Sequence, residues 1–210
     1  MNRSLIGLAC AALLAAAPLQ AQDDEPRRGG PGPSLVPYAG VHQALGTLLT
    51  EPDGIGGWEA RTGLLLGARL EFPVARRSAI QADVGYATPS IRGFGEAFED
   101  FEAEGRFLSF TARVSRLLTD TPLPYTRRIG LSVHAGGGLM RHWVASPRPT
   151  TSTWPTAVAG LTVRLPVTRR FTAFLTGDLY VYRASFEDGL VRRAMQQDLR
   201  ISVGAWLPGN

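Results

Sequence analysis

Residues 58–72 read WEARTGLLLGARLEF, and this stretch decides how the rest of the chain is understood. Successive side chains of a strand point to opposite faces, so apolar residues at every second position indicate a β-strand with one apolar face. The mostly apolar set is Trp58, Ala60, Thr62, Leu64, Leu66, Ala68, Leu70 and Phe72. The opposing set is mostly charged or small, and consists of Glu59, Arg61, Gly63, Leu65, Gly67, Arg69 and Glu71.

The same alternation recurs along the chain. An earlier candidate strand, residues 35–45, has less distinct faces. Six further strands with clear alternation follow residues 58–72, so the chain has eight candidate strands in total. Their lengths are comparable with the about 9–11 residues that a tilted strand needs to cross a bilayer. The six later segments are 79–86, 107–115, 129–139, 157–165, 171–181 and 199–207.

Two kinds of connection join these segments. Residues 72–77 (FPVARR), 123–128 (LPYTRR) and 165–170 (LPVTRR) are short, and we expect their Pro to end the preceding strand because it has no N–H for the ladder. Short turns at one end and long loops at the other are typical of an up-and-down barrel, with both chain ends on the short-turn side. The longer connections are about 46–57, 88–105, 145–155 and 184–197.

The charged face is predicted to line the inside of the barrel. It holds many glycines, which weaken a solvent-facing strand but make room for long side chains inside a narrow barrel. It also holds equal numbers of Arg and acidic residues, as buried charges require partners. We therefore predict an ion-pair network in the lumen, made of Glu59, Arg61, Arg69, Glu71, Asp83, Arg113, Arg164, Asp178, Asp198 and Arg200.

The apolar face is then predicted to contact lipid. Trp58 at one end of its strand, with Phe72 and Phe171 at the other boundary, suits aromatic girdles at the two membrane surfaces. The predicted fold class is therefore all-β, an eight-stranded antiparallel up-and-down transmembrane β-barrel over residues 35–210. The alternative is a soluble lipocalin-like barrel in the periplasm, with its apolar face inside and a small apolar ligand bound there.

Composition excludes other classes. The net charge is +4, all 22 basic residues are Arg, and no basic run suggests nucleic-acid binding.

The single cysteine, Cys10, lies in residues 1–21, which resemble a cleavable signal peptide ending near Ala21. Residues 22–34 are polar and rich in Gly and Pro, and we expect a disordered periplasmic tether. The three scattered histidines do not indicate a metal site, and we expect no cofactor.

At this level the chain resembles the small eight-stranded outer-membrane barrels, the OmpA-like or OmpX-like β-barrel domains. The resemblance covers residues 35–210 and rests on architecture. It implies a location in the outer membrane, contact with its lipid and lipopolysaccharide, and insertion by the barrel-assembly machinery. It also implies a structural or surface-interaction role, with the surface partner left open. One departure is the ending Leu207-Pro208-Gly209-Asn210, where this family usually ends in an aromatic residue.

Enzymatic activity is not predicted. Ser132 and His134 lie two apart on one face, with Asp178 as a possible orienting residue, and this is similar to the pair of outer-membrane lipid A deacylases. In that family the His comes first and the pair faces lipid, whereas here the order is reversed and both residues face inward. A lipid A-modifying enzyme remains an alternative.

An eight-stranded lumen filled by charged side chains also predicts no sizeable pore.

Two loops are candidate binding surfaces. In the first, Phe94, Phe98 and Phe101 are spaced to share one side of a short helix, among acidic residues that include Glu99 and Asp100. These residues could contact a partner or a divalent cation. In the second, Arg192 and Arg193 could meet lipopolysaccharide phosphates. For both, a solvated loop is the simpler interpretation.

Overall fold

A computed structural model describes residues 33–50, 57–94, 101–122, 128–145, 150–168, 171–184 and 194–206. The predicted signal peptide and almost all of the predicted tether lie outside these residues. The described part has no helix long and apolar enough to span a membrane.

The described residues form nine strands. They are β1 (Ser34–Ala44), β2 (Thr47–Thr50), β3 (Gly57–Ala75), β4 (Ser78–Phe94), β5 (Phe101–Pro122), β6 (Arg128–Val144), β7 (Thr150–Pro166), β8 (Thr172–Ala184) and β9 (Ala194–Trp206).

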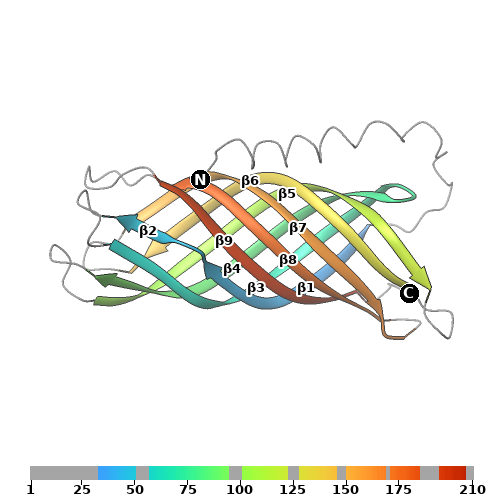
Figure 1. The fold of residues 1–210 in the computed structure, drawn as a ribbon, viewed down its shortest axis with the longest axis horizontal. Coiled ribbons are helices and arrows are strands. Elements are labelled where there is room, and N and C mark those ends of the chain that lie inside the picture. Colours follow the sequence, from blue (N-terminus) through green and yellow to red (C-terminus); the bar gives the residue numbers. More distant parts are fainter. Residues whose placement is uncertain are drawn as a thin grey trace.

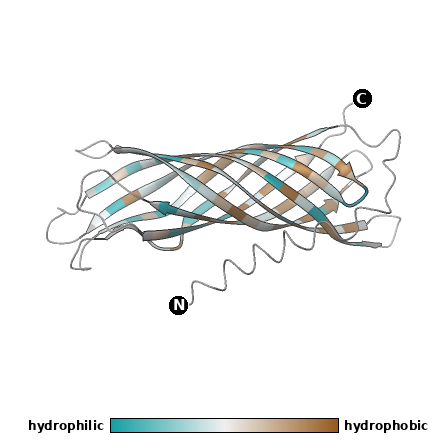
Figure 2. Cartoon of the chain, turned by 90° about the horizontal axis from the view of Figure 1, so that it is seen from above, coloured by the Kyte–Doolittle hydropathy of each residue, from teal (hydrophilic) through white to brown (hydrophobic). Residues whose placement is uncertain are grey.

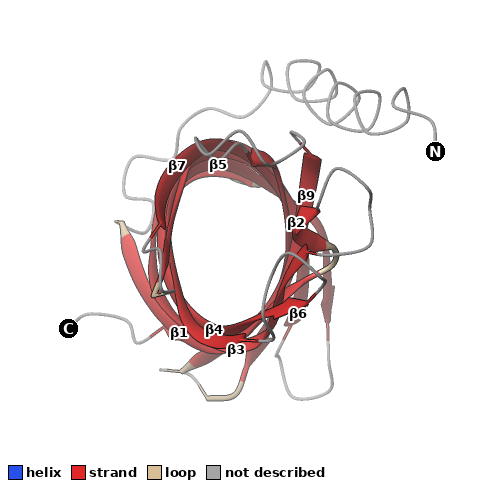
Figure 3. Cartoon of the chain, turned by 90° about the vertical axis from the view of Figure 1, so that its left-hand side faces the viewer, coloured by secondary structure: helices blue, strands red, loops and turns tan. Residues whose placement is uncertain are grey.

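The strands close into a barrel (Figure 1). From β2 to β9 each pairs antiparallel with the next, and β1 pairs antiparallel with both β9 and β3. The chain bends at Leu45 and Gly46, so β1 and β2 follow one another along the same edge of β3 and count as one position of the barrel. Seen along its axis, the sheet is a continuous ring (Figure 3). The predicted eight-stranded antiparallel architecture is confirmed.

The strands are longer than the sequence pattern predicted. β3 has 19 residues and β5 has 22, and residues 88–94 and 101–105 belong to strands where a loop was expected. Pro73 does not end β3, which continues to Ala75 with a register shift. The loop-side strand ends were placed too early because the apolar alternation stops there, whereas the ladder is made by the backbone and continues beyond it.

Outward-facing side chains divide the barrel into two sections. In the turn-side section, nearest the β3–β4 turn at Arg76 and Arg77, they are apolar and exposed, as at Phe110 and Leu139. Figure 2 shows apolar and polar residues alternating along the strands. On each of the eight strand positions, the loop-side section starts at the polar outward residue that follows the apolar band in the direction of the long loops. These residues are Gln43, Thr62, Thr88, Arg106, Arg141, Thr153, Arg183 and Gln197.

The two sections also differ inside. The turn-side interior is polar and charged, as predicted for the lumen. The loop-side interior is mostly apolar and aromatic, with a core that includes Trp58, Ile91, Phe107, Val144 and Trp154. The loop-side section therefore has the polarity of a soluble protein, with apolar residues inside and polar residues outside. The turn-side section has the reverse polarity.

Candidate functional site

A cluster of buried charges crosses the turn-side lumen. Arg113 of β5 forms ion pairs with Asp83 of β4 at 3.1 Å and with Asp178 of β8 at 2.9 Å. The same guanidinium donates to Thr111 Oγ1 at 3.0 Å and to the Tyr180 hydroxyl. The Arg113 and Asp83 side chains have no exposed surface. Since Asp83 and Asp178 come from strands far apart around the ring, Arg113 connects distant parts of the wall.

Arg69 completes this cluster from β3. Its guanidinium lies 3.0 Å from Asp83 and 3.5 Å from Asp178. The Tyr38 hydroxyl of β1 donates to Asp83 at 3.0 Å. Each of the two carboxylates is thus held by both arginines, and a charge-assisted network of this kind satisfies groups that would otherwise be costly to bury.

A second ion pair lies nearer the short turns. Arg164 of β7 contacts Glu71 of β3 at 2.6 Å, and Gln81 donates to the same carboxylate at 2.9 Å. The Arg164 side chain is 31% exposed, so this pair is more accessible than the central cluster.

Arg200 and Asp198 face inward as predicted, but their partners differ from the prediction. Arg200 donates to His42 Nδ1 at 3.2 Å and to Ser109 Oγ at 2.6 Å, and it lies over the Tyr180 ring at 4.1 Å. Asp198 accepts from the Tyr182 hydroxyl at 3.1 Å. Within the described residues Arg200 has no ion pair with a carboxylate, so the network also depends on Tyr and His side chains.

Glu59 and Arg61 were predicted in the lumen, and this prediction is wrong. Both are exposed on the outside, and Trp58, assigned to an outer girdle, is buried inside at 7% exposure. The cause is a β-bulge, since Ala60 pairs with Ile91 and Gly63 with Pro89, which leaves one extra residue on β3. An extra residue exchanges the two faces of every position beyond it.

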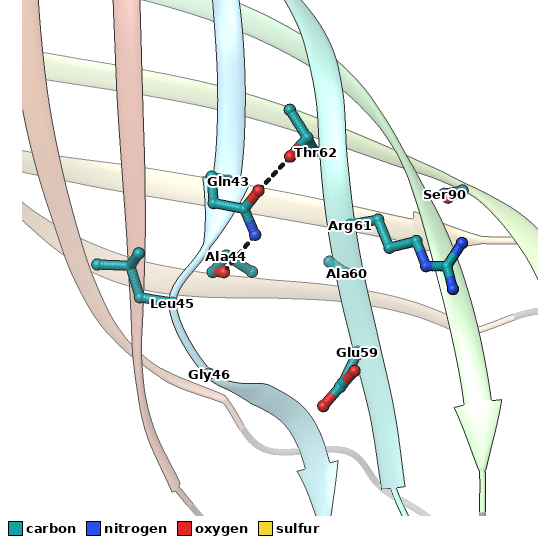
Figure 4. A pocket seen from close by; sticks show the side chains of 9 residues that line it. All are labelled: Gln43, Ala44, Leu45, Gly46, Glu59, Ala60, Arg61, Thr62 and Ser90. Carbon is teal, nitrogen blue, oxygen red and sulfur yellow. Dashed lines mark hydrogen bonds between the residues drawn. The ribbon is translucent and has the colours of Figure 1, made fainter.

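An open pocket lies at the same break in the wall. Its volume is about 860 Å³, and it lies where β1 and β2 separate from β3. Figure 4 shows Gln43 reaching across the gap, where it accepts a hydrogen bond from Thr62. The lining residues are Gln43, Ala44, Leu45, Gly46, Glu59, Ala60, Arg61, Thr62 and Ser90.

An aromatic layer lies inside the loop-side section. The Phe107 and His142 rings stack with centroids 3.8 Å apart. His142 meets Trp154 at 4.4 Å, and Trp154 stacks on Tyr182 at 5.6 Å. All four side chains are almost fully buried. Sequence reasoning missed this layer because it treated the interior as polar throughout.

Ser132 and His134 face inward as predicted and are at most 2% exposed. They do not form a nucleophile–base pair, because Ser132 donates to the Thr162 carbonyl at 3.3 Å. His134 Nε2 instead contacts Asp178. A Cβ at Gly160 would lie 2.5 Å from Asp178 Oδ1 and 2.6 Å from His134 Nε2, so this glycine makes room for the His–Asp contact.

The remaining candidate sites lie largely outside the described part of the chain. Phe98, Glu99, Asp100, Arg192 and Arg193 all fall there. The backbones of Phe94 and Phe101 belong to β4 and β5, so the short helix proposed for this segment is wrong at both ends. No group of three or more His, Cys, Asp or Glu residues in the described ranges could hold a metal ion.

The fold defines a class, that of small closed antiparallel barrels with an apolar outer band. Among solved structures, the chain is similar to Neisserial surface protein A (NspA), with a TM-score of 0.58 and 13% identity, over 85% of this chain and 99% of that one. OprG and the N-terminal domain of OprF, both from Pseudomonas aeruginosa, each match 85% of this chain and 95% and 100% of their own. Their TM-scores are 0.47 and 0.46, at 9% and 11% identity. No family model and no curated protein matches the sequence.

These likenesses concern the fold. The chain has the architecture of the small eight-stranded outer-membrane barrels, and the family resemblance seen in the sequence is confirmed at that level.

Proposed function

We propose that this protein is an outer-membrane barrel with a closed lumen and a structural or surface-interaction role. The central observation is the arrangement of Arg113 and Arg69 between Asp83 and Asp178, which occupies the lumen with buried ion pairs. The aromatic layer around Phe107 and His142 lies above it and supports the same conclusion. An eight-stranded barrel leaves an interior that side chains can fill, so no space for diffusion is expected.

The orientation follows from the two ends of the barrel. The short turns and both ends of the sheet, at Ser34 and Trp206, lie on one side, because Ser34 pairs with Glu71 and Trp206 with Thr172. In this proposal that side faces the periplasm, after export, cleavage near Ala21 and insertion by the barrel-assembly machinery. The loop-side section then projects beyond the membrane, where its polar exterior presents a surface for contact with an unidentified partner.

Two measurements test this proposal. Boiled and unboiled samples of the detergent-extracted protein should differ in mobility in mild SDS, as a closed membrane barrel does. The purified protein should give no stable conductance in planar bilayers. The matched variant combines Arg113→Ala with Asp178→Ala, which removes one charge of each sign and should increase conductance. A stable channel in the unmodified protein would overturn the closed lumen, and release by osmotic shock without detergent would overturn the membrane location.

The alternatives are less well supported. A soluble ligand-binding barrel requires a polar exterior, yet Phe110 and Leu139 are 54% and 53% exposed on the outer surface of the turn-side section. A lipid A-modifying enzyme requires catalytic groups that reach lipid, yet Ser132 and His134 are buried inside the barrel.

A further inference from the structure

Arginine is concentrated at one edge of the apolar outer band. Of the eight residues that begin the loop-side section, Arg106, Arg141 and Arg183 are basic and none is acidic. All three arginines are exposed. If the loop side faces outward, this edge lies where the acyl chains of the outer leaflet end and its headgroups begin. This step rests on the proposed function.

The densest part of this edge lies on β5 and β6. Arg106 is directly opposite Trp143 in the ladder, and Arg141 is opposite Leu108. Arg141 and Trp143 are two residues apart and therefore share the outer face. The Arg141 guanidinium lies over the Trp143 ring, 4.9 Å from its centroid. Arg106, Arg141 and Trp143 thus form one compact surface group, which we call the β5–β6 basic group.

Arg141 is the cation of this group that is available to an anion. Arg106 Nε is 3.1 Å from Glu104 Oε1, and this exposed pair fixes its guanidinium while neutralising part of its charge. Arg141 has no acidic partner among the residues that the structure describes. The Trp143 ring holds Arg141 against the wall and leaves the guanidinium edge free, and that edge can donate two parallel hydrogen bonds to a phosphate.

The surface directly below the group is apolar. Leu108 is opposite Arg141, and Phe110 is opposite Leu139, with both Phe110 and Leu139 exposed. A molecule that fits this surface has a phosphate at the level of Arg141 and hydrocarbon chains extending toward Phe110. Trp at such a boundary is typical of membrane interfaces.

We propose that the β5–β6 basic group is a binding site for the phosphate of an outer-leaflet glycolipid of the lipid A type. Arg141 binds the phosphate, Arg106 adds positive charge, and Trp143 orients Arg141. The acyl chains lie on Phe110 and Leu139. This site is on the barrel wall and is separate from Arg192 and Arg193, the loop residues considered from the sequence.

The test uses the folded protein in phosphatidylethanolamine nanodiscs containing bis-phosphorylated lipid A, with retained lipid measured by native mass spectrometry. The double variant Arg106→Gln/Arg141→Gln should bind about 5-fold to about 30-fold more weakly, since a full interfacial Arg contributes about 1 kcal/mol to binding an anionic surface and Arg106 is partly neutralised by Glu104. The matched control is Arg76→Gln/Arg77→Gln, which removes two exposed arginines from the opposite end. Its lipid A binding should equal that of the unmodified protein.

Further outcomes separate this inference from the proposed function. Lipid A lacking its phosphates should bind the unmodified protein and the double variant equally. Equal losses in both double variants, no loss in either, or equally strong retention of phosphatidylglycerol would overturn the site. The heat-dependent mobility shift is measured on the same samples. Retention of that shift with no lipid A effect rejects only the site, whereas failure to insert into nanodiscs rejects the membrane barrel itself.

Discussion

The turn-side and loop-side sections belong to one continuous sheet, yet they bury opposite kinds of side chain. In the turn-side section the interior is built around Arg113, Asp83 and Asp178. In the loop-side section it is built around Phe107, Ile91 and Trp154. Apart from the bulges, as between Ala60 and Gly63, the strands alternate inward and outward residues in both sections, so the fold is the same and the chemistry of each face changes.

The difference follows from what surrounds each section. When the exterior contacts lipid, outward apolar residues such as Leu139 are favoured and the interior is free to be polar, provided every charge has a partner. When the exterior contacts water, the ordinary hydrophobic effect acts and apolar residues such as Phe107 move inside. The boundary between the sections therefore marks the outer surface of the membrane in the proposed orientation.

The largest expected effect comes from the charged interior. Arg113→Leu leaves Asp83 and Asp178 with less compensation in a buried site, and should lower the free energy of unfolding by roughly 3–5 kcal/mol. The measurement is urea unfolding of the protein folded into lipid vesicles.

Arg61→Leu is the matched control for Arg113→Leu. Arg61 is exposed on the loop-side exterior, so its replacement should change the unfolding free energy by less than about 0.5 kcal/mol. A large cost at Arg61 and none at Arg113 would mean that the two faces are assigned the wrong way round.

The apolar interior of the loop-side section should behave like a soluble core. Ile91 has no exposed surface, and Ile91→Ala should cost about 2–5 kcal/mol because it leaves a cavity. Ile80 faces outward on the same strand with 47% exposure, and Ile80→Ala should cost less than about 1 kcal/mol in lipid. The same vesicle unfolding assay compares them, and equal costs would contradict the inverted interior.

The sequence pattern predicted the fold well because period-two alternation is a backbone property that survives the change of polarity. It did not predict the face exchange at the start of β3. The extra residue lies between Ala60 and Gly63, where Arg61 and Thr62 are both exposed, and Leu64 to Leu66 beyond it keep a regular alternation. Without the partner strand an extra residue is invisible, so Glu59 and Trp58 were placed on the wrong faces.

The candidate site was predicted only in part. Alternation indicates which face Arg113 or Asp178 occupies, and eight of the ten proposed lumen residues do face inward. It does not indicate which residues meet across the barrel, because that depends on strand stagger and tilt. The contact of Arg113 with Tyr180 and that of Arg200 with His42 were therefore missed.

A charge on the outer surface should distinguish the sections by their surroundings. Leu161→Arg places a cation in the middle of the apolar band, on the same strand as Thr153, and should cost about 2–4 kcal/mol if the band lies in lipid. Thr153→Arg places the same cation on the loop-side exterior and should cost about 0–1 kcal/mol. Vesicle unfolding measures both. Equal, small costs would show that the outer band is not in lipid.

The smallest expected effect concerns Ser132. Its hydroxyl donates one hydrogen bond to the Thr162 carbonyl, and Ser132→Ala should lower the unfolding free energy by about 1 kcal/mol. Because Ser132 is not paired with His134, the acylation pattern of lipid A from cells expressing Ser132→Ala should match that from cells expressing the unmodified protein, as read by mass spectrometry. His134→Ala separates the two interpretations further, because it removes the contact with Asp178 and should destabilise the barrel more than Ser132→Ala does. Loss of lipid A modification in both variants would instead assign a catalytic role to the two residues.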